Sequence, residues 1–204
     1  MSQSTTILLI RHGSNPKVGI GLTGWLPGVS LDEKGRQQAE RLAAELADAP
    51  LTAVYSSPLE RAMETAAPLA RRKKLEVSPD PAFGEVRFGE WQGKDFAEIG
   101  RDAEWQKFND FRSGTRAPGG ELMLETQARM VAGLLNISAR HRGETVAIFS
   151  HADAIKSVLC WLLGIPLDFH LRLEILPASV STIVLSDEGV PRVISINICY
   201  AHYQ

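Results

Sequence analysis

The chain has 204 residues, of which 44% are hydrophobic, so it can bury a substantial core, and its length predicts a single domain over residues 1–204. Its 22 basic and 24 acidic residues are interspersed and give a formal net charge of -2, which argues against nucleic acid as a partner. The longest apolar run near the start, Ile7–Ile10, is too short for a signal peptide, and no segment approaches the ~20 apolar residues of a membrane span. We therefore expect no membrane partner and a cytoplasmic protein.

The first part of the chain predicts two short strands, with a long loop and a helix between them. Residues 6–10 are apolar and partly β-branched, as in a strand buried on both faces, and the Gly-, Pro- and Ser-rich residues 14–31 predict a long loop. Residues 52–55 predict a second strand. Asp32 can cap the helix between them, in which apolar side chains recur with helical spacing (Ala39, Leu42, Ala43 and Leu46).

The residues after the second strand carry several signals of a helix start. Ser57 can serve as the N-cap, Pro58 suits the first helical position, and Glu60 lies three residues after the cap. Arg61 then falls in the first turn, where the helix dipole disfavours a cation by a few tenths of a kcal/mol unless an anion is bound there. Two interpretations stay open, because Arg61 can either bind such an anion or be an exposed arginine paired with Glu60 or Glu64.

The rest of the chain continues the alternation of helices and strands. Residues 78–93 have no helical period and contain several Gly and Pro, which predicts a second long loop. Residues 145–149 predict a third buried strand, followed by a helix that ends at Gly164. A strand at 171–175 and a hairpin of 180–185 with 191–198 around the turn 186–189 are predicted next. Between the second loop and the third strand, a long helix from Glu121 to about Arg140 is indicated by the spacing of Leu124, Ala128, Val131 and Leu135.

Polar side chains follow three of these strands at the point where each strand ends. Arg11 and His12 follow the first strand, the helix start with Arg61 follows the second, and His151 follows the third. Because the carboxyl ends of parallel strands meet at one edge of a sheet, these groups can share a pocket that suits a dianion. Phosphoryl transfer needs such cations, a neutral imidazole as nucleophile and a carboxylic acid for the leaving oxygen. Glu85, flanked by apolar residues that can raise its pKa, is the best candidate acid.

With these residues in place, the sequence resembles the histidine phosphatase superfamily, the phosphoglycerate mutase-like enzymes. Within it, the chain is most similar to uncharacterised phosphatase or phosphomutase-like proteins of actinobacterial type that carry Ser-His-Ala-Asp. The matching segments run in the family's order: Leu9–Gly13, Leu22–Trp25, Leu31–Ala39, Ser56–Ala66, Glu85–Gly93, Pro118–Glu121 and Phe149–Asp153.

The resemblance implies a fold and a set of roles. The fold is an α/β three-layer α/β/α sandwich with a mostly parallel six-stranded sheet and one antiparallel strand. His12 is the nucleophile that forms a phosphohistidine, and Glu85 is the proton donor. Arg11, Arg61 and His151 clamp the phosphoryl group. The wider phosphate- and substrate-binding set adds Gly13, Ser14, Thr23, Gly24 and Ala152, with no metal and no cofactor.

Two departures from the family's pattern affect the site. Ser14 follows the Arg-His-Gly triplet where many relatives have Glu or Gln, and Val18 stands where Asn is common, so that Asn15 is an alternative for that role. The Ser-His-Ala-Asp variant adds Asp153 near the pocket. This carboxylate can orient His151, repel a second negative group, or simply favour the helix N-terminus.

Three functions remain in view. A true phosphoglycerate mutase has a longer insertion with adjacent arginines after the acid loop, whereas residues 94–116 are short here and hold Arg101, Arg112 and Arg116 apart. A phosphatase that hydrolyses a small phosphorylated metabolite is therefore preferred, with phosphomutase activity as the first alternative. A non-catalytic phospholigand-binding module is the second alternative. We expect an activity optimum on the acidic side of neutrality and allow for a homodimer.

Overall fold

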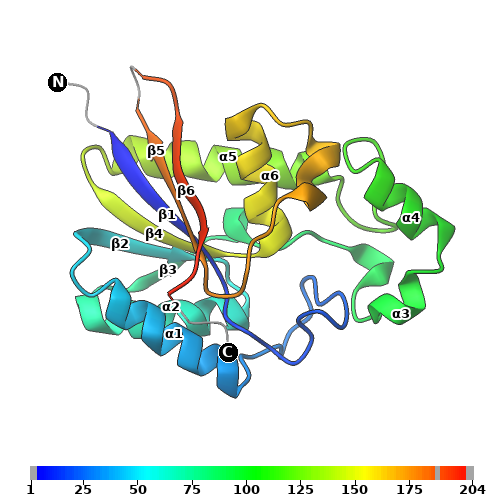
Figure 1. The fold of residues 1–204 in the computed structure, drawn as a ribbon, viewed down its shortest axis with the longest axis horizontal. Coiled ribbons are helices and arrows are strands. Elements are labelled where there is room, and N and C mark those ends of the chain that lie inside the picture. The colour runs from blue at the N-terminus through cyan, green and yellow to red at the C-terminus, as the bar shows by residue number, and fades with distance from the viewer. Residues whose placement is uncertain (1–3, 187–188, 201–204) are drawn as a thin grey trace.

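The described residues of the computed structural model, 4–186 and 189–200, form one six-stranded sheet with the strand order β3-β2-β4-β1-β5-β6 (Figure 1). β1 and β4 pair in parallel at its centre, and β2 and β3 extend the parallel part. β5 pairs antiparallel with both β1 and β6, so it alone runs against the other strands of this sheet. The bounds are β1 Thr5–Arg11, β2 Leu51–Ser56, β3 Val77–Pro79, β4 Thr145–Ser150, β5 Val180–Leu185 and β6 Arg192–Ile198.

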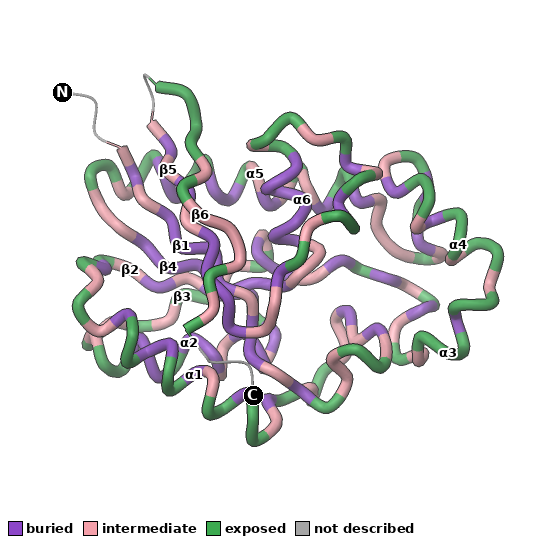
Figure 2. The backbone as a smooth tube through the Cα atoms, viewed as in Figure 1, coloured by how far each residue is buried: buried purple, intermediate pink, exposed green. Residues whose placement is uncertain are grey.

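Helices cover both faces of the sheet, which confirms the three-layer prediction. The α-helices are α1 Glu33–Glu45, α2 Glu60–Lys73, α3 Phe96–Ile99, α4 Ala103–Asp110, α5 Met123–Arg140 and α6 Ala152–Leu163. Three short 3-10 helices are η1 Pro81–Phe83, η2 Gly89–Trp91 and η3 Leu167–Arg172. Ile7 and Leu9 of β1 face α5 and α6, whereas Leu8 and Ile10 face α1 and α2. This alternation of one strand's side chains between two apolar layers is why its sequence is continuously hydrophobic, and Figure 2 shows the buried backbone concentrated along the central strands and the helix faces toward them.

A third apolar cluster lies beside the sheet, under the segment that contains α3 and α4. Phe88, Trp91 and Phe108 are buried there, and the ring of Trp105 packs against all three. This cluster anchors the loop between β3 and α5, and with it Glu85, to the body of the protein. Along the described ranges, no helix has both the length and the apolar character that a membrane crossing requires.

Two strand predictions need correction. Residues 171–175 do not form a strand, because η3 continues to Arg172 and the chain then returns toward β1, where Ala178 N–H donates to the Arg11 carbonyl oxygen. Leu171 is exposed on η3, whereas Ile175 is buried in the irregular stretch that follows, so the alternating pattern does not correspond to a pleated strand. The missed strand is β3, whose three residues end in a proline and pair only at the sheet edge.

Two helix predictions also change in detail. α5 is present, but Leu124 and Leu135, whose spacing predicted it, are exposed, and its buried face is formed by residues such as Met130 and Leu134. α2 begins at Glu60 with Leu59 as its N-cap and without a side-chain cap, so the capping box expected at Ser57 is absent. The hairpin of β5 and β6 is confirmed, whereas residues 187 and 188 of its turn lie outside the described residues.

Candidate active site

The two histidines that follow β1 and β4 lie next to each other because these strands are neighbours. Arg11 pairs with Ser150 in the sheet register, and His12 N–H donates to the Ser150 carbonyl oxygen at 3.0 Å. The rings of His12 and His151 have centroids 5.2 Å apart and are inclined by 57°. Both residues are buried. The parallel pairing of β1 with β4 therefore brings together two imidazoles that are distant in the sequence.

The imidazole of His12 has a defined orientation. Its Nδ1 lies 2.7 Å from the Gly13 carbonyl oxygen, and because that oxygen can only accept, Nδ1 carries the hydrogen. In the neutral ring, Nε2 then holds the lone pair. Burial, followed by the charges of Arg61 and Arg11, holds the pKa of His12 well below its ordinary value. Near neutral pH, His12 is therefore a neutral base with a nucleophilic nitrogen at Nε2.

Arg61 is completely buried and has two donor atoms that no described residue satisfies. Its Nη2 donates to the Gly24 carbonyl oxygen at 2.9 Å, whereas Nε and Nη1 find no acceptor. The carboxylates of Glu60 and Glu64 instead accept from backbone amides of the first loop, so the interpretation of Arg61 as an exposed, paired arginine is wrong. A buried guanidinium with unused donors costs free energy unless an anion binds, and phosphate oxygens suit its fork geometry.

The loop carbonyl that holds Arg61 requires glycine at its position. Gly24 has φ +48, and a Cβ there would lie 2.4 Å from Oε1 of Gln92. That same oxygen accepts from the Trp25 amide at 2.7 Å. The backbone around Gly24 is thus fixed by close packing, which presents its carbonyl to Arg61.

His151 has one nitrogen engaged and one nitrogen unused. Its Nε2 lies 2.8 Å from the Ser57 hydroxyl, while Nδ1 has no hydrogen-bond partner in the described structure and lies 4.0 Å from Oε2 of Glu85. Burial, followed by the charges of Arg61 and His12, keeps the pKa of His151 well below its ordinary value. Ser57 therefore orients the ring of His151 instead of capping α2.

The carboxyl group of Glu85 is largely shielded from solvent. Its side chain is 13% exposed, and Oε1 accepts from the Val86 amide at 2.9 Å. Burial, followed by the negative charge of Asp153, raises the pKa of Glu85 to about 7 against the opposing effect of Arg61. The carboxyl group is thus protonated below neutrality, as the apolar surroundings in the sequence predicted.

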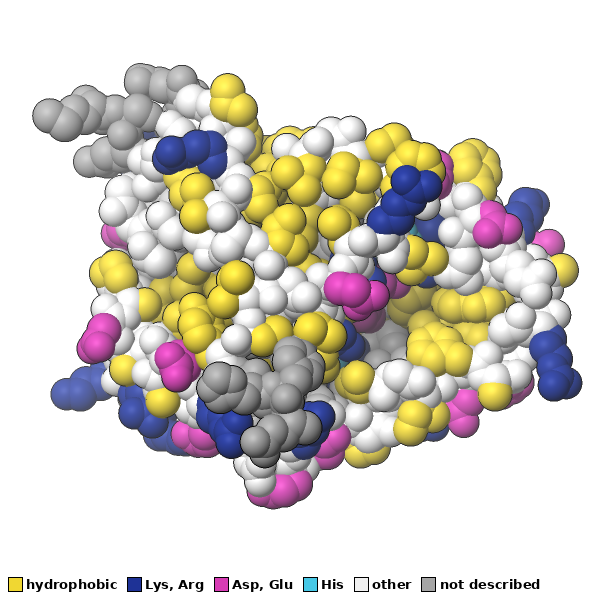
Figure 3. Space-filling model, viewed as in Figure 1, with side chains coloured by type: hydrophobic (Ala, Val, Ile, Leu, Met, Phe, Trp, Pro, Cys, Tyr) yellow, Lys and Arg dark blue, Asp and Glu magenta, His cyan; other side chains and the backbone are white. Residues whose placement is uncertain are grey.

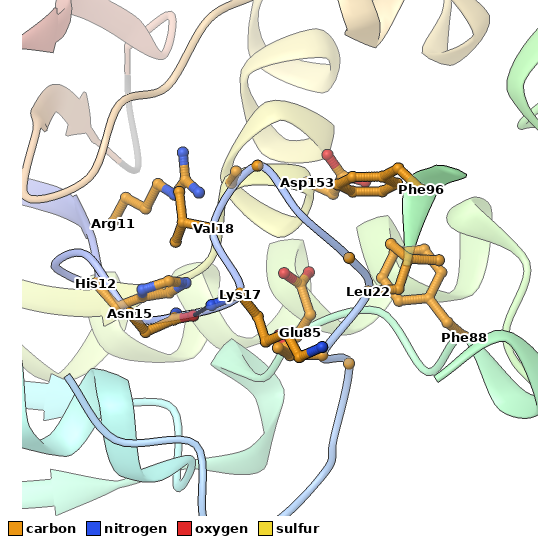
Figure 4. Close-up of a pocket in the computed structure, with 15 residues that line it drawn as sticks. Arg11, His12, Asn15, Lys17, Val18, Leu22, Glu85, Phe88, Phe96 and Asp153 are labelled. Carbon is orange, nitrogen blue, oxygen red and sulfur yellow. Dashed lines mark hydrogen bonds between the residues drawn. The ribbon is translucent and has the colours of Figure 1, made fainter. Parts of the chain in front are cut away.

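His12 and Glu85 line a cavity that has an apolar side and a second carboxylate (Figure 4), whereas Arg61 and His151 are not among its lining residues. It opens on the face shown in Figure 3, at the hollow right of centre, and its combination of apolar side chains with a few polar groups suits a small molecule. In Figure 4, Arg11 and His12 lie at one side, with Glu85 between them and the group of Asp153, Phe96, Leu22 and Phe88. The lining residues are Arg11, His12, Asn15, Lys17, Val18, Gly19, Gly21, Leu22, Thr23, Gly24, Glu85, Phe88, Phe96, Ala152 and Asp153.

Over residues 7–198, the sequence matches the family described as the histidine phosphatase superfamily, branch 1. The chain belongs to this superfamily. Among curated relatives, this histidine phosphatase is 32% identical to phosphoserine phosphatase 1 of Hydrogenobacter thermophilus over 79% of this chain and 77% of the relative. It is 34% identical to phosphoglycerate mutase-like protein 4 of Arabidopsis thaliana, over 74% of this chain and 68% of the relative. A solved structure of Entamoeba histolytica phosphoserine phosphatase in complex with 3-phosphoglyceric acid superposes with a TM-score of 0.85, at 26% identity over 96% of this chain and 98% of that one.

The remaining predicted site residues of this histidine phosphatase fall into two groups. Thr23, Gly24 and Ala152 line the cavity. Gly13 and Ser14 do not, because the Gly13 amide donates to Thr65 Oγ1, and the Ser14 hydroxyl donates to Asp32 at the N-terminus of α1. Gly13 and Ser14 thus bond to other parts of the fold and do not line the cavity.

Asn15, the alternative to the asparagine that Val18 replaces, lies at the cavity wall. It is 3% exposed, lines the cavity together with Val18, and lies close to His12 in Figure 4. Its Oδ1 accepts from the Lys17 amide at 2.9 Å, which fixes the orientation of the side-chain amide. The sequence offered Asn15 as an alternative to the asparagine that is common at the position of Val18. The place of Asn15 at the cavity agrees with this alternative.

The sequence did not predict that Arg129 holds the backbone at Glu85 in place. Arg129 of α5 donates to the carbonyl oxygens of Ala82, Gly84 and Glu85, and its guanidinium is paired with Glu121 at 3.1 Å. Glu121 lies in one of the segments that match the family, Pro118–Glu121. Arg129 lies in none of them, and the sequence shows it only as a charged residue within a predicted helix. These hydrogen bonds fix the backbone from which the Glu85 carboxyl group projects.

Asp153 makes contacts that the sequence did not suggest. Its Oδ2 accepts from Arg112 Nη1 at 2.9 Å, and its Oδ1 lies 3.8 Å from Nε2 of buried His170. It has no hydrogen bond to His151 in the described structure, so the proposed role in orienting that ring is wrong. Within residues 4–186 and 189–200, no group of three or more His, Cys, Asp and Glu side chains is arranged to hold a metal ion.

Proposed function

We propose that this histidine phosphatase hydrolyses a small phosphomonoester through a phosphohistidine on His12. In the first step, Nε2 of His12 attacks phosphorus, the bond from phosphorus to the ester oxygen breaks, and Glu85 gives its proton to that oxygen. The donors of Arg11 and Arg61 and the imidazole of His151 stabilise the equatorial phosphoryl oxygens. The products are a free alcohol, phosphorylated His12 and ionised Glu85.

The second step returns the enzyme to its starting state. The Glu85 carboxylate accepts a proton from a water molecule, whose oxygen attacks phosphorus while the bond to Nε2 breaks. Inorganic phosphate leaves, and both His12 and Glu85 are again neutral. One carboxyl group thus serves as acid and then as base, which suits a pKa of about 7.

The observation that carries the proposal is the pair of unused donors on buried Arg61, beside two neutral imidazoles. A permanently charged, buried guanidinium favours an anion at this point, and the protonated Glu85 supplies the acid that ester cleavage requires. The family and the phosphatase relatives support the same reaction class.

The placement of the three arginines in residues 94–116 favours hydrolysis over mutase chemistry. Arg112 is buried against Asp153, and Arg116 forms a salt bridge with Glu125 at 2.6 Å. None of the three lines the cavity, whose described basic residues are Arg11 and Lys17. Arg101, Arg112 and Arg116 are thus not placed to bind a second phosphate group at the cavity.

The test is to trap the phosphorylated enzyme. Protein quenched in alkali after mixing with a radiolabelled phosphomonoester is expected to carry phosphate that is stable in alkali and is released on later exposure to acid, and His12→Ala should abolish this phosphate together with turnover. His141→Gln is a matched control, because His141 is bonded to Tyr55 and Glu144 away from the cavity and should keep both. Turnover retained by His12→Ala would overturn the mechanism.

A further inference from the structure

Asp153 places a carboxylate in the part of the cavity where the leaving alcohol must lie. It is in the first turn of α6, two residues after His151, and its side chain is 20% exposed. Figure 4 shows it beside Phe96, on the far side of the cavity from Arg11 and His12. A phosphoryl group bound by His12 and Arg61 therefore directs its ester substituent toward Asp153.

The negative charge of Asp153 is stabilised by a buried arginine, Arg112. Arg112, whose side chain is 3% exposed, donates to Oδ2 and is itself held by Asn109 at 2.6 Å and by the ring of Phe108 at 4.5 Å. Burial alone would raise the pKa of Asp153, but Arg112, His170 and Lys156 together lower it to about 2. The carboxylate is therefore ionised throughout the working range of the enzyme.

The second oxygen of Asp153 is available to a ligand. In the described structure, Oδ1 accepts no hydrogen bond, and the ring nitrogen of His170 is too distant at 3.8 Å. The other acid at the cavity, Glu85, is neutral below pH 7. Lys17, the lysine at the cavity wall, already donates to Asp95 at 2.9 Å. Asp153 is thus a fixed anionic acceptor on the side of the cavity that Leu22, Phe88 and Phe96 line with apolar groups.

We propose that Asp153 selects substrates, so that this enzyme prefers phosphomonoesters of amino alcohols, whose ammonium group binds Oδ1 of Asp153. The inference rests on the proposed phosphatase function. An ammonium group at this place gains a charge-assisted hydrogen bond, whereas a second phosphate is repelled by the same carboxylate. The selection acts on the leaving group and leaves the phosphoryl clamp unchanged.

The test uses two matched pairs of substrates in which an ammonium group replaces a hydroxyl group. The first pair is phosphoethanolamine and 2-hydroxyethyl phosphate, and the second is O-phosphoserine and 3-phosphoglycerate. At about pH 5.5, below the pKa of about 7 that Glu85 has in the unmodified enzyme, this enzyme is expected to favour the ammonium member of each pair by about tenfold or more in kcat/KM. No preference in either pair overturns the inference.

Asp153→Asn then assigns the preference to this carboxylate. It should lower kcat/KM for the ammonium members by about tenfold, mainly through KM, and change the hydroxyl members by less than about threefold. Glu98→Gln, which removes an equal charge from the exposed surface of α3, should leave the preference unchanged. An equal fall for both members of a pair would instead mean that Asp153 acts on the chemical step, and this inference would be wrong.

Two further measurements protect the interpretation. Because Asp153→Asn leaves Arg112 buried without its anion, the double variant Asp153→Asn/Arg112→Gln is measured in parallel and should show the same loss of preference. p-Nitrophenyl phosphate serves as a reference without an ammonium group. If the enzyme hydrolyses neither it nor any member of the pairs, the proposed function itself fails. If it hydrolyses the reference without preferring ammonium, only the role of Asp153 fails.

Discussion

Nδ1 of His151 and Oε2 of Glu85 lie 4.0 Å apart, and near pH 6 neither group is charged. A histidine and a carboxyl group at this distance usually form an ion pair, which raises the pKa of the histidine and lowers that of the acid. Here burial moves both pKa values the other way, and the charge of Arg61 lowers the pKa of His151 further. The proton therefore stays on Glu85, where the proposed mechanism requires it.

The first prediction concerns the pH dependence of catalysis. Because the pKa of Glu85 is raised to about 7, the acid is protonated below that pH and loses its proton above it. For an alkyl phosphomonoester, kcat/KM is expected to fall above about pH 7 by tenfold per pH unit, while His12 stays neutral over the same range. A profile that is flat from about pH 5 to 9 in single-turnover measurements would contradict the role of Glu85.

The second prediction separates proton donation from phosphate binding. Glu85→Gln cannot donate a proton, so kcat for alkyl phosphates should fall by about 10²- to 10⁴-fold. p-Nitrophenyl phosphate, whose leaving group needs no proton, should lose much less in the first step. This comparison is made by measuring the burst of nitrophenol and the single-turnover cleavage of the alkyl ester. Equal losses for both substrates would count against Glu85 as the acid.

The third prediction is that Glu85 makes the folded protein less stable at alkaline pH. Its pKa of about 7 when folded exceeds the ordinary value of 4.5, so the folded state binds the proton more tightly and stability falls as pH rises from 4.5 to 7. The cost is about 3 kcal/mol at pH 8 as an upper figure. Glu85→Gln should therefore raise the free energy of unfolding at about pH 8 but not at about pH 4.5, as denaturant titrations can measure. An equal change at both pH values would disagree with this account.

The fourth prediction concerns the unused donors of Arg61. Inorganic phosphate or vanadate should raise the Tm of the protein, since a ligand at 100 times its Kd stabilises by about 2.7 kcal/mol. Arg61→Met should nearly abolish this shift without lowering the Tm of the free protein, because it removes a buried charge whose Nε and Nη1 have no described partner. Arg36→Met, which changes the same charge on the exposed side of α1, is the control and should keep the phosphate shift.

The sequence was sufficient to predict which strand ends meet at the candidate site. Arg11, His12 and His151 follow continuous apolar runs, and such runs place their carboxyl ends at one sheet edge whatever the details of the loops. The reversal of β5 and the three layers followed from the family resemblance. The single domain over residues 1–204 stays a prediction.

Contacts between distant segments were not predictable from local patterns. Ser57 has the local signature of an N-cap, but its hydroxyl lies against His151, which follows β4, and α2 begins later. Arg112 and Asp153 are paired across the third apolar cluster, which no spacing in the sequence indicates. The exposed leucines of α5 show the same limit, because the period of a helix does not tell which of two apolar stripes meets the sheet.

The adjacency of β1 and β4 also has a consequence for how the protein refolds. These strands are separated by most of the chain, with β2, β3 and five α-helices between them in the sequence. A refolding chain can form those helices early, yet it has no histidine pair until this distant strand pairing closes, and such pairings are slow. After dilution from denaturant, turnover should therefore return later than helical circular dichroism. Enzyme activity in this protein therefore reports on the pairing of β1 with β4 at the centre of its sheet.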